Sequence, residues 1–416
     1  MTAAVEEAPG SVRAPPVEGR LLGIDVARAV AQLGMLITHY TYFDGSGGDL
    51  RGVTRFFNGK AMPLFVFLGG LGFTMLTRRA AHPVGQALAR GSVLVVIGLL
   101  LVEHAPLIAV ILQFYGLFFA LGLLVRRLPG VWLLVLAGVT TIVGGWSWLY
   151  LAPDRVRYGG WQGWETVTDP RPLLIDLLVS GSYPALPTFA FFLVGMWVGR
   201  QALGRRQVQM LLIGAGLALA LAGYVGGEIV TRATTDRQEL TRTIALDDGA
   251  AAERIEDRVE RRGDSRRDAV RVVVRERERA AGTAPLARLA DPVGHGKMPA
   301  WVIGATGWSL AVVGLSLLAY ARRPRLLHPV ACAGQLALTF YVLQALGLRW
   351  WYTEEWSKQY SYTRQVVACF VIFGVFVAVA TAWRRVLPRG PLEALLRLSG
   401  MAGSAVAARL PGGSGR

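Results

Sequence analysis

The feature that most constrains this chain is a series of long apolar segments. Residues 91–102, 131–151, 211–225 and 366–380 are apolar around the whole circumference of a helix rather than along one face. A helix of that kind lies deep inside a large protein or in contact with lipid. Many such segments of about 20 residues cannot all be enclosed by one soluble core, so the sequence predicts a membrane protein.

Composition and charge agree with this prediction. Charged residues make up only 17% of the chain, whereas a soluble protein carries about 25%. The net charge of +16 raises the question of nucleic-acid binding. The arginines, however, occur in pairs at the ends of apolar segments, as topology determinants do, so nucleic acid is not an expected partner. Residues 1–19 are polar and the first apolar segment is long enough to remain a span, so no cleaved signal peptide is expected.

We therefore expect an all-α fold, a polytopic integral membrane bundle of about ten transmembrane helices with both termini cytoplasmic. The expected spans are residues 21–42, 60–77, 85–103, 107–125, 130–151, 184–200, 208–230, 299–321, 329–350 and 363–383. Arginines concentrate in every second connection, which marks those connections as cytoplasmic. They are Arg78, Arg79, Arg126, Arg127, Arg200, Arg205, Arg206, Arg322, Arg323, Arg325, Arg384, Arg385 and Arg389.

These spans predict five regions. A cytoplasmic tail (1–19) precedes a transmembrane domain of about seven spans (20–230). A long charged loop (231–298) follows on the extracytoplasmic side, and its opposite charges three or four residues apart predict a partly helical, solvated spacer or lid. A second transmembrane domain of about three spans (299–386) leads into a cytoplasmic amphipathic tail (387–416).

Ionisable residues within a membrane are costly and therefore mark candidate sites. Asp25 and Arg28 lie three residues apart near the inner end of the first span, on one face of the helix. They form either a local ion pair that fixes helix packing or an anchor for an anionic ligand such as a cofactor phosphate. The two cysteines, Cys332 and Cys369, lie inside expected spans and indicate packing rather than a disulfide or metal site.

Three of the five histidines are expected at the outer ends of spans: His39, His104 (next to Glu103) and His295. Singly, each is typical of a structural residue. Together they predict an outward-facing polar site in which imidazole acts as a general base or nucleophile. A zinc site built from the same residues is a weaker alternative, because no two histidines have the spacing of a helical metal motif. The candidate substrate-binding residues around the site are Tyr40, Asp44, Gln113, Tyr115, Asp176 and Tyr183.

Several segments resemble one known family. RLLGIDVARAVAQLGMLITHY (20–40) resembles the start of the catalytic domain of heparan-α-glucosaminide N-acetyltransferase and its bacterial relatives, and residues 63–73, 98–124 and 180–200 are similar to later parts of that domain. ACAGQLALTFYVLQALG (331–347), together with residues 389–397, resembles a bacterial membrane domain of unknown function that is often joined to the catalytic domain.

The resemblance implies a membrane-bound acyltransferase. Such an enzyme holds no permanent cofactor; it takes an acyl group, here expected to be acetyl, from acyl-CoA on the cytoplasmic side. It delivers the group to a sugar, glycolipid or small-molecule acceptor on the other side, with a histidine central to transfer. By position, His39 and His104 are the catalytic candidates with His295 and Glu103, and Asp25 and Arg28 match the donor-binding pattern of the first span. Some relatives have histidine where this chain has Gln344.

Two other functions remain open at this point. A transporter or exporter of an envelope precursor or small molecule fits ten spans with buried polar residues, although no internal inverted repeat is visible. A non-catalytic scaffold built on the 231–298 loop is the other. In each case we expect a multi-pass protein of the cell membrane in contact with lipids. A homo-oligomer of this chain is an open alternative to a single copy.

Overall fold

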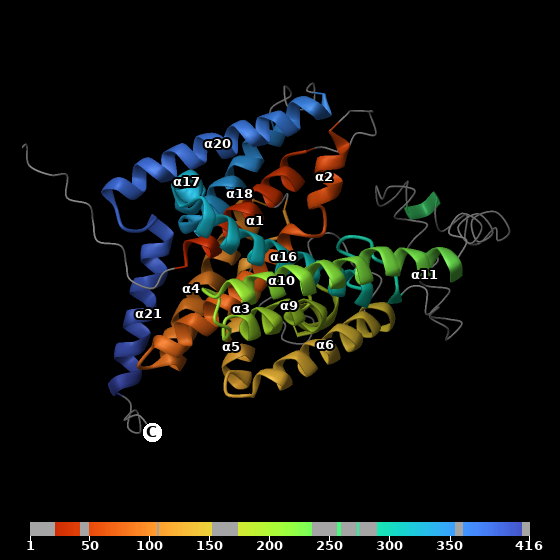
Figure 1. The fold of residues 1–416 in the computed structure, drawn as a ribbon, viewed down its shortest axis with the longest axis horizontal. Coiled ribbons are helices and arrows are strands. Elements are labelled where there is room, and N and C mark those ends of the chain that lie inside the picture. Colours follow the sequence, from red (N-terminus) through yellow and green to blue (C-terminus); the bar gives the residue numbers. More distant parts are fainter. Residues whose placement is uncertain are drawn as a thin grey trace, which may run out of the picture.

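A computed structural model describes residues 21–41, 50–105, 108–151, 174–234, 256–258, 273, 289–353 and 361–409. Within these ranges the regular elements are all helices (Figure 1), which confirms the all-α class. They are α1 (Leu22–Tyr40), α2 (Arg51–Phe57), α3 (Ala61–Arg79), α4 (Pro83–His104), α5 (Leu112–Val125), α6 (Gly130–Tyr150), the π-helix η1 (Asp176–Ser180), α9 (Ala185–Val198), α10 (Arg206–Ala220), the π-helix η2 (Leu221–Gly226), α11 (Gly227–Thr234), α16 (Pro299–Arg322), α17 (Pro324–Gln335), α18 (Ala337–Thr353), α20 (Tyr362–Val386) and α21 (Pro391–Arg409).

The membrane-spanning character follows from helix length and composition. In the described part of the chain, 6 helices are long and apolar enough to cross a membrane, and 7 if the bent pair α17 and α18 is one span. The apolar helices α5 and α9 are shorter. Each of the segments expected to span contains a helix. The chain is thus an all-helical, multi-pass membrane bundle, while the number of about ten spans and the cytoplasmic termini stay predictions.

One expected span, residues 329–350, is not a straight helix. It is divided between α17 and α18, which meet at an angle of 65°. The carboxylate of Glu393, in α21, accepts hydrogen bonds from the backbone N–H groups of Leu338 (2.8 Å) and Thr339 (3.0 Å). This carboxylate supplies the partners that the first N–H groups of a new helix require, so the break is stabilised from outside the segment.

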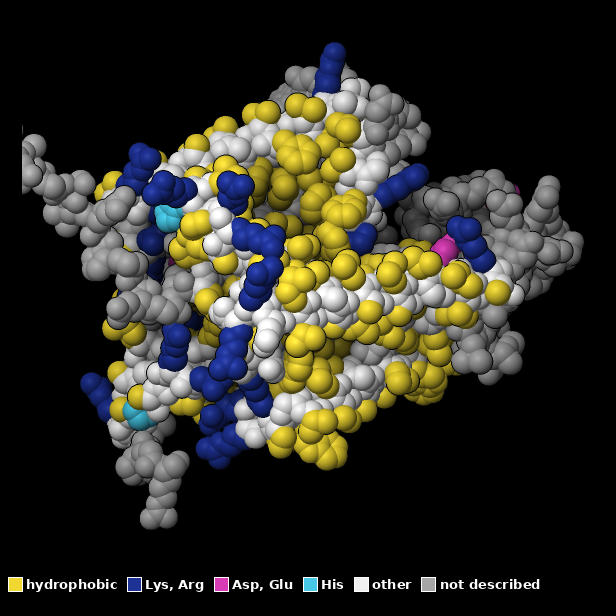
Figure 2. Space-filling view, in the orientation of Figure 1, with side chains coloured by type: hydrophobic (Ala, Val, Ile, Leu, Met, Phe, Trp, Pro, Cys, Tyr) yellow, Lys and Arg dark blue, Asp and Glu magenta, His cyan; other side chains and the backbone are white. Residues whose placement is uncertain are grey.

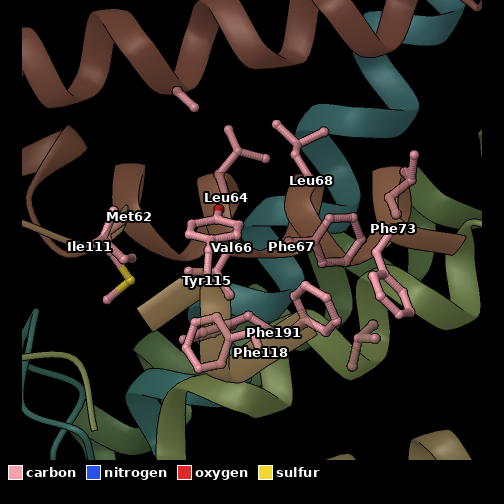
Figure 3. Packing of buried hydrophobic residues seen from close by; sticks show 14 of the residues in the cluster. Met62, Leu64, Val66, Phe67, Leu68, Phe73, Ile111, Tyr115, Phe118 and Phe191 are labelled. Carbon is pink, nitrogen blue, oxygen red and sulfur yellow. The ribbon is translucent and has the colours of Figure 1, made fainter. Parts of the chain in front are cut away.

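The core of the bundle is aromatic and rests on close helix contacts (Figure 3). Phe67, Phe118 and Phe191 are fully buried. The helices α3 and α9 approach closely at Gly70 and Gly195, where a Cβ atom would collide with backbone of the facing helix. Small residues allow such contacts between membrane helices, as the LFVFLGGLGF segment indicates.

The helix α1 lies between the two halves of the chain (Figure 1) and contacts both. Near its start, Gly23 packs against the backbone of Leu317 in α16. Midway, the amide of Gln32 donates a hydrogen bond to the carbonyl of Ala337 (2.9 Å). At its end, the hydroxyl of Tyr40 donates to the carbonyl of Gln344 (2.6 Å). Residues on α1 are therefore held by the N-terminal and C-terminal halves together.

The described surface has one basic end and apolar flanks (Figure 2). Lys and Arg side chains gather at the left of this view, around α4, α21 and the C-terminal end of α20, while hydrophobic side chains cover α6, α10 and α20. The arginines that end α3, α16 and α20 contribute to the basic end. The expected amphipathic segment near residue 390 is part of the longer α21, which packs along α4 with Gly85 against Gly403.

Candidate functional site

The pair predicted at the inner end of the first span forms an ion pair. Nη1 of Arg28 lies 2.6 Å from Oδ1 of Asp25, one turn earlier on α1. The carboxyl side chain is 1% exposed and the arginine 29%. A Cβ atom at Gly72 would lie 3.4 Å from Nη2 of Arg28, so the guanidinium faces α3. A guanidinium has five N–H donors in all, so N–H groups remain for an anionic ligand.

The pair belongs to a larger polar cluster that sequence analysis did not find. Asp25 lies close enough to Tyr320 (α16) and Cys332 (α17) to act on both electrostatically. Arg384, at the end of α20, acts on the same thiol, and Nε2 of His328 is 3.6 Å from it. The sequence showed these residues only as helix-end arginines, a loop histidine and a packing cysteine. The side chains of this cluster come together only because α1, α16, α17 and α20 pack side by side.

Tyrosines continue this polar path through the core. Tyr115 interacts electrostatically with both Tyr341 and Arg28. Tyr341 in turn interacts with Tyr183. Each hydroxyl has a backbone partner: Tyr115 donates to the carbonyl of Phe65 (2.8 Å), Tyr183 donates to that of Ala109 (3.0 Å), and Tyr341 accepts from the N–H of Ile111 (3.3 Å). The path joins two predicted residues through a third, Tyr341, that the sequence did not single out.

Two of the three predicted histidines lie near each other at the other end of α1. His39 precedes the last residue of α1, and His295 lies in the loop before α16. They are close enough to interact electrostatically. The pKa of His295 is lowered, mainly because the surrounding protein excludes water from the ring and further by the charges of Lys297 and His39. Because its pKa is lowered, this imidazole is neutral at neutral pH. Its side chain remains partly accessible, so the lone pair of the neutral ring is available to a substrate.

Contacts between the turn before α3 and the turn before α16 hold His295 in place. Nε1 of Trp301 donates a hydrogen bond to the carbonyl of Gly59 (2.9 Å), and Gly59 itself packs against Gly294. His295 and Lys297 have φ of 63° and 59°, the only positive values among the described residues other than glycine. Such conformations are disfavoured for residues with a Cβ and concentrate at functional sites, where the surrounding structure maintains them.

Two lysines lie beside the histidines. Lys297 is buried, with Nζ 4.7 Å from the centre of the Trp148 ring. Lys60, before α3, donates to the carbonyl of Phe56 (2.7 Å) and lies 5.0 Å from the Tyr224 ring. Sequence analysis missed both lysines, although a signal was present: each follows a glycine and precedes Met-Pro at the start of a helix, in GKAMP and in GKMP.

The other predicted site residues lie elsewhere or outside the described ranges. His104 and Glu103 are exposed at the end of α4, and Nδ1 of His104 is 2.8 Å from the carbonyl oxygen of Leu100. Tyr40 faces α18. Asp44 lies outside the described residues, as does the side chain of Asp176.

Gln113 is buried beside Gly98. Its Oε1 has no hydrogen-bond partner in the described structure. The described residues contain no cluster of His, Cys, Asp and Glu able to hold a metal.

Comparison with known protein families gives two matches. The model described as "Heparan-alpha-glucosaminide N-acetyltransferase, catalytic" matches residues 20–228, and the one described as "Protein of unknown function (DUF418)" matches residues 291–401. No curated protein matches the chain. The first match contains Asp25, Arg28 and His39, and the second contains His295, so the candidate site combines residues of both matched regions.

Proposed function

Because this chain belongs to the family of the heparan-alpha-glucosaminide N-acetyltransferase catalytic domain, we propose that it transfers an acetyl group from acetyl-CoA across the cell membrane. The acceptor is an amine or hydroxyl of an envelope sugar, glycolipid or small molecule. The observation that supports the proposal is that His39 and His295 lie near each other at the end of α1 opposite the Asp25–Arg28 pair.

The distance between the two ends suits transfer across a membrane. Asp25 and His39 are 14 residues apart on one continuous helix. At 1.5 Å per residue, that separation is about 21 Å along the axis, most of the roughly 30 Å hydrocarbon thickness. A donor bound by its phosphates at one end thus needs an extended arm to bring a thioester to the other.

The donor would bind at the basic end. Arg28 has N–H donors not used by Asp25, and a guanidinium binds phosphate oxygens in bidentate fashion. Arg384 and the other arginines at the ends of α16 and α20 add positive charge around it. The row from Arg28 through Tyr115 to Tyr341 supplies a partly polar wall for the arm of the donor.

At the histidine end, a neutral imidazole takes the proton from the acceptor N–H or O–H as that atom attacks the thioester carbonyl carbon. The carbon–sulfur bond of the resulting tetrahedral intermediate then breaks. The CoA thiolate leaves and takes up the proton from the imidazolium. Lys297 and Lys60, which lie in the same part of the structure, would supply positive charge to stabilise the negative oxygen of that intermediate.

The test separates donor binding from transfer. We would purify the protein in nanodiscs, measure release of CoA thiol with glucosamine as the first acceptor, and measure acetyl-CoA binding by thermal shift. His39→Ala and His295→Ala should bind acetyl-CoA but lose about 100-fold or more in transfer rate. His104→Ala is the matched control, because His104 is exposed and bonded to its own helix. Full transfer by both folded variants would eliminate the histidine mechanism.

The donor end has its own pair of variants. Arg28→Ala should weaken acetyl-CoA binding, whereas Arg232→Ala, at an exposed ion pair with Glu228 near the end of α11, should not. If acetyl-CoA produces no shift in folded wild-type protein, or if the two arginine variants behave alike, donor binding at Arg28 is wrong.

A transporter is the second candidate, favoured by one observation. The pair α17 and α18 forms a broken helix with an angle of 65°, and transporters place such breaks at substrate sites. The carboxylate of Glu393 and the amide of Gln32 lie at the break. Movement of a sugar into proteoliposomes without consumption of acetyl-CoA would favour this function over the first.

A further inference from the structure

A hollow in the C-terminal half belongs to neither end of the proposed acetyl path. It has a volume of about 470 Å³ and lies between α1, α18 and α20. Tyr40, Gly347 and Trp350 form one wall, and Arg364, Ala368 and Val371 form the other. The volume is within the range of about 300–1,000 Å³ found for small-molecule sites.

The hollow opens on a face of the bundle that we expect lipid rather than water to cover. Trp350 is 57% exposed and Val371 59%, and both belong to helices with outward apolar residues. The helix α20 ends in Arg384 and Arg385 at the basic end of the molecule, so the hollow near its start lies toward the opposite end. Tryptophan at such a place marks the boundary between hydrocarbon and headgroups. The hollow therefore opens at the level where a lipid chain joins its headgroup.

Arg364 is the single charged group among the residues that line the hollow. It lies in the first turn of α20 and is exposed, and no described residue forms an ion pair or hydrogen bond with it. An arginine in this position extends its guanidinium toward the headgroups while its methylene groups remain in the apolar layer. The neighbours of such a guanidinium in a bilayer are lipid phosphates, which it binds in bidentate fashion.

We propose that the hollow binds an anionic phospholipid, with one acyl chain between α18 and α20 and the headgroup phosphate on Arg364. Charge complementarity selects this occupant: an apolar hollow whose one charged lining residue, Arg364, has no partner among the described residues matches a hydrocarbon chain that ends in an anion. The bound chain touches Tyr40, whose hydroxyl bonds the carbonyl of Gln344. The lipid thus stabilises the end of α1 that carries His39. The proposal does not depend on the acetyl-transfer chemistry.

The test measures lipid binding by native mass spectrometry of the purified full chain, titrated with phosphatidylglycerol and with phosphatidylcholine. The wild type should bind phosphatidylglycerol more tightly. Arg364→Ala should weaken that binding about fivefold, the effect of one arginine near an anionic headgroup, and leave phosphatidylcholine binding nearly unchanged. The matched control is Arg349→Ala, which removes an exposed arginine from α18 that does not line the hollow.

A second variant tests the chain-binding part. Ala368→Phe places a ring in the hollow and should weaken binding of both lipids, with an unfolding curve showing that the protein remains folded. Four results would overturn the proposal: equal affinity of the wild type for the two lipids, no binding of either lipid, equal losses in Arg364→Ala and Arg349→Ala, or unchanged binding in folded Ala368→Phe. Equal losses would show diffuse surface charge, and no binding of either lipid would show that another part of the chain fills the hollow.

Discussion

Removal of the Glu393 carboxylate tests how the broken helix is stabilised. This carboxylate accepts two backbone hydrogen bonds from the first turn of α18 and a third from the hydroxyl of Thr339 (2.6 Å). A hydrogen bond to a charged group contributes about 1.5–3 kcal/mol. Because Glu393 is half-buried, we use the lower value, and the two backbone bonds together contribute about 3 kcal/mol. Glu393→Ala should therefore destabilise the protein by about 3 kcal/mol, and Glu393→Gln, which keeps a neutral acceptor, by about half as much.

The assay combines denaturant unfolding in detergent with hydrogen exchange of the amides at residues 338 and 339. Exchange should accelerate there in Glu393→Ala before other parts of α18 change. Glu228→Ala serves as the control, since it removes an exposed ion pair with Arg232, worth about 0–1 kcal/mol. Unchanged protection of the two amides in Glu393→Ala, or an equal loss of stability in Glu228→Ala, would refute the reasoning.

Three further predictions rest on single contacts. Gly70→Ala should destabilise the protein far more than Gly72→Ala on the same helix. A Cβ atom at Gly70 would collide with the backbone of Phe192, whereas one at Gly72 would lie 3.4 Å from a flexible arginine. Unfolding curves of the two variants check this, and equal losses of stability would contradict it. The pKa of His295 is lowered in the folded protein, so the stability that its neutral ring contributes is complete above the ordinary histidine value near 6.5. That stability is lost as the pH falls below this value, by about 1 kcal/mol for a partly solvated ring. His295→Gln should therefore flatten the dependence of stability on pH in that window, and an unchanged slope would count against the prediction. Trp301→Phe should cost about 1–2 kcal/mol by leaving the buried carbonyl of Gly59 without its donor, and should lower acetyl transfer more than acetyl-CoA binding, which the two assays above measure separately.

The positions of the helices could be predicted from the sequence because apolar length fixes where a segment can cross a membrane. The break in residues 329–350 could not, since the segment reads as one apolar run. What stabilises the break is a carboxylate more than 50 residues later in the chain, Glu393, at the first turn of α18. A long-range contact of that kind leaves no trace in local hydropathy.

The residue types of the candidate site could be predicted from the sequence, but which of those residues lie near one another could not. The sequence indicates that histidines gather at outer ends of spans, and it cannot say that His39 lies near His295 while His104 remains on the surface of α4. The position of His295 depends on the hydrogen bond between Trp301 and Gly59, which joins turns far apart in the sequence. The lysines were missed because a lysine beside a span normally indicates topology. Burial of Lys297 against Trp148 becomes visible only once the loop before α16 is placed beside the end of α6.

The position of α1 explains why two matched family regions occur in one chain. Three groups on this helix contact the C-terminal region: the backbone of Asp25 packs against Gly334, Gln32 bonds the carbonyl of Ala337, and His39 lies near His295. Without residues 291–401 the buried amide of Gln32 would lose its acceptor, and an unsatisfied amide within a membrane is costly. The region of unknown function is thus a structural part of the site that the catalytic-domain region begins, and substitutions at Gly334 and Trp301 should affect α1 as directly as substitutions on α1 itself.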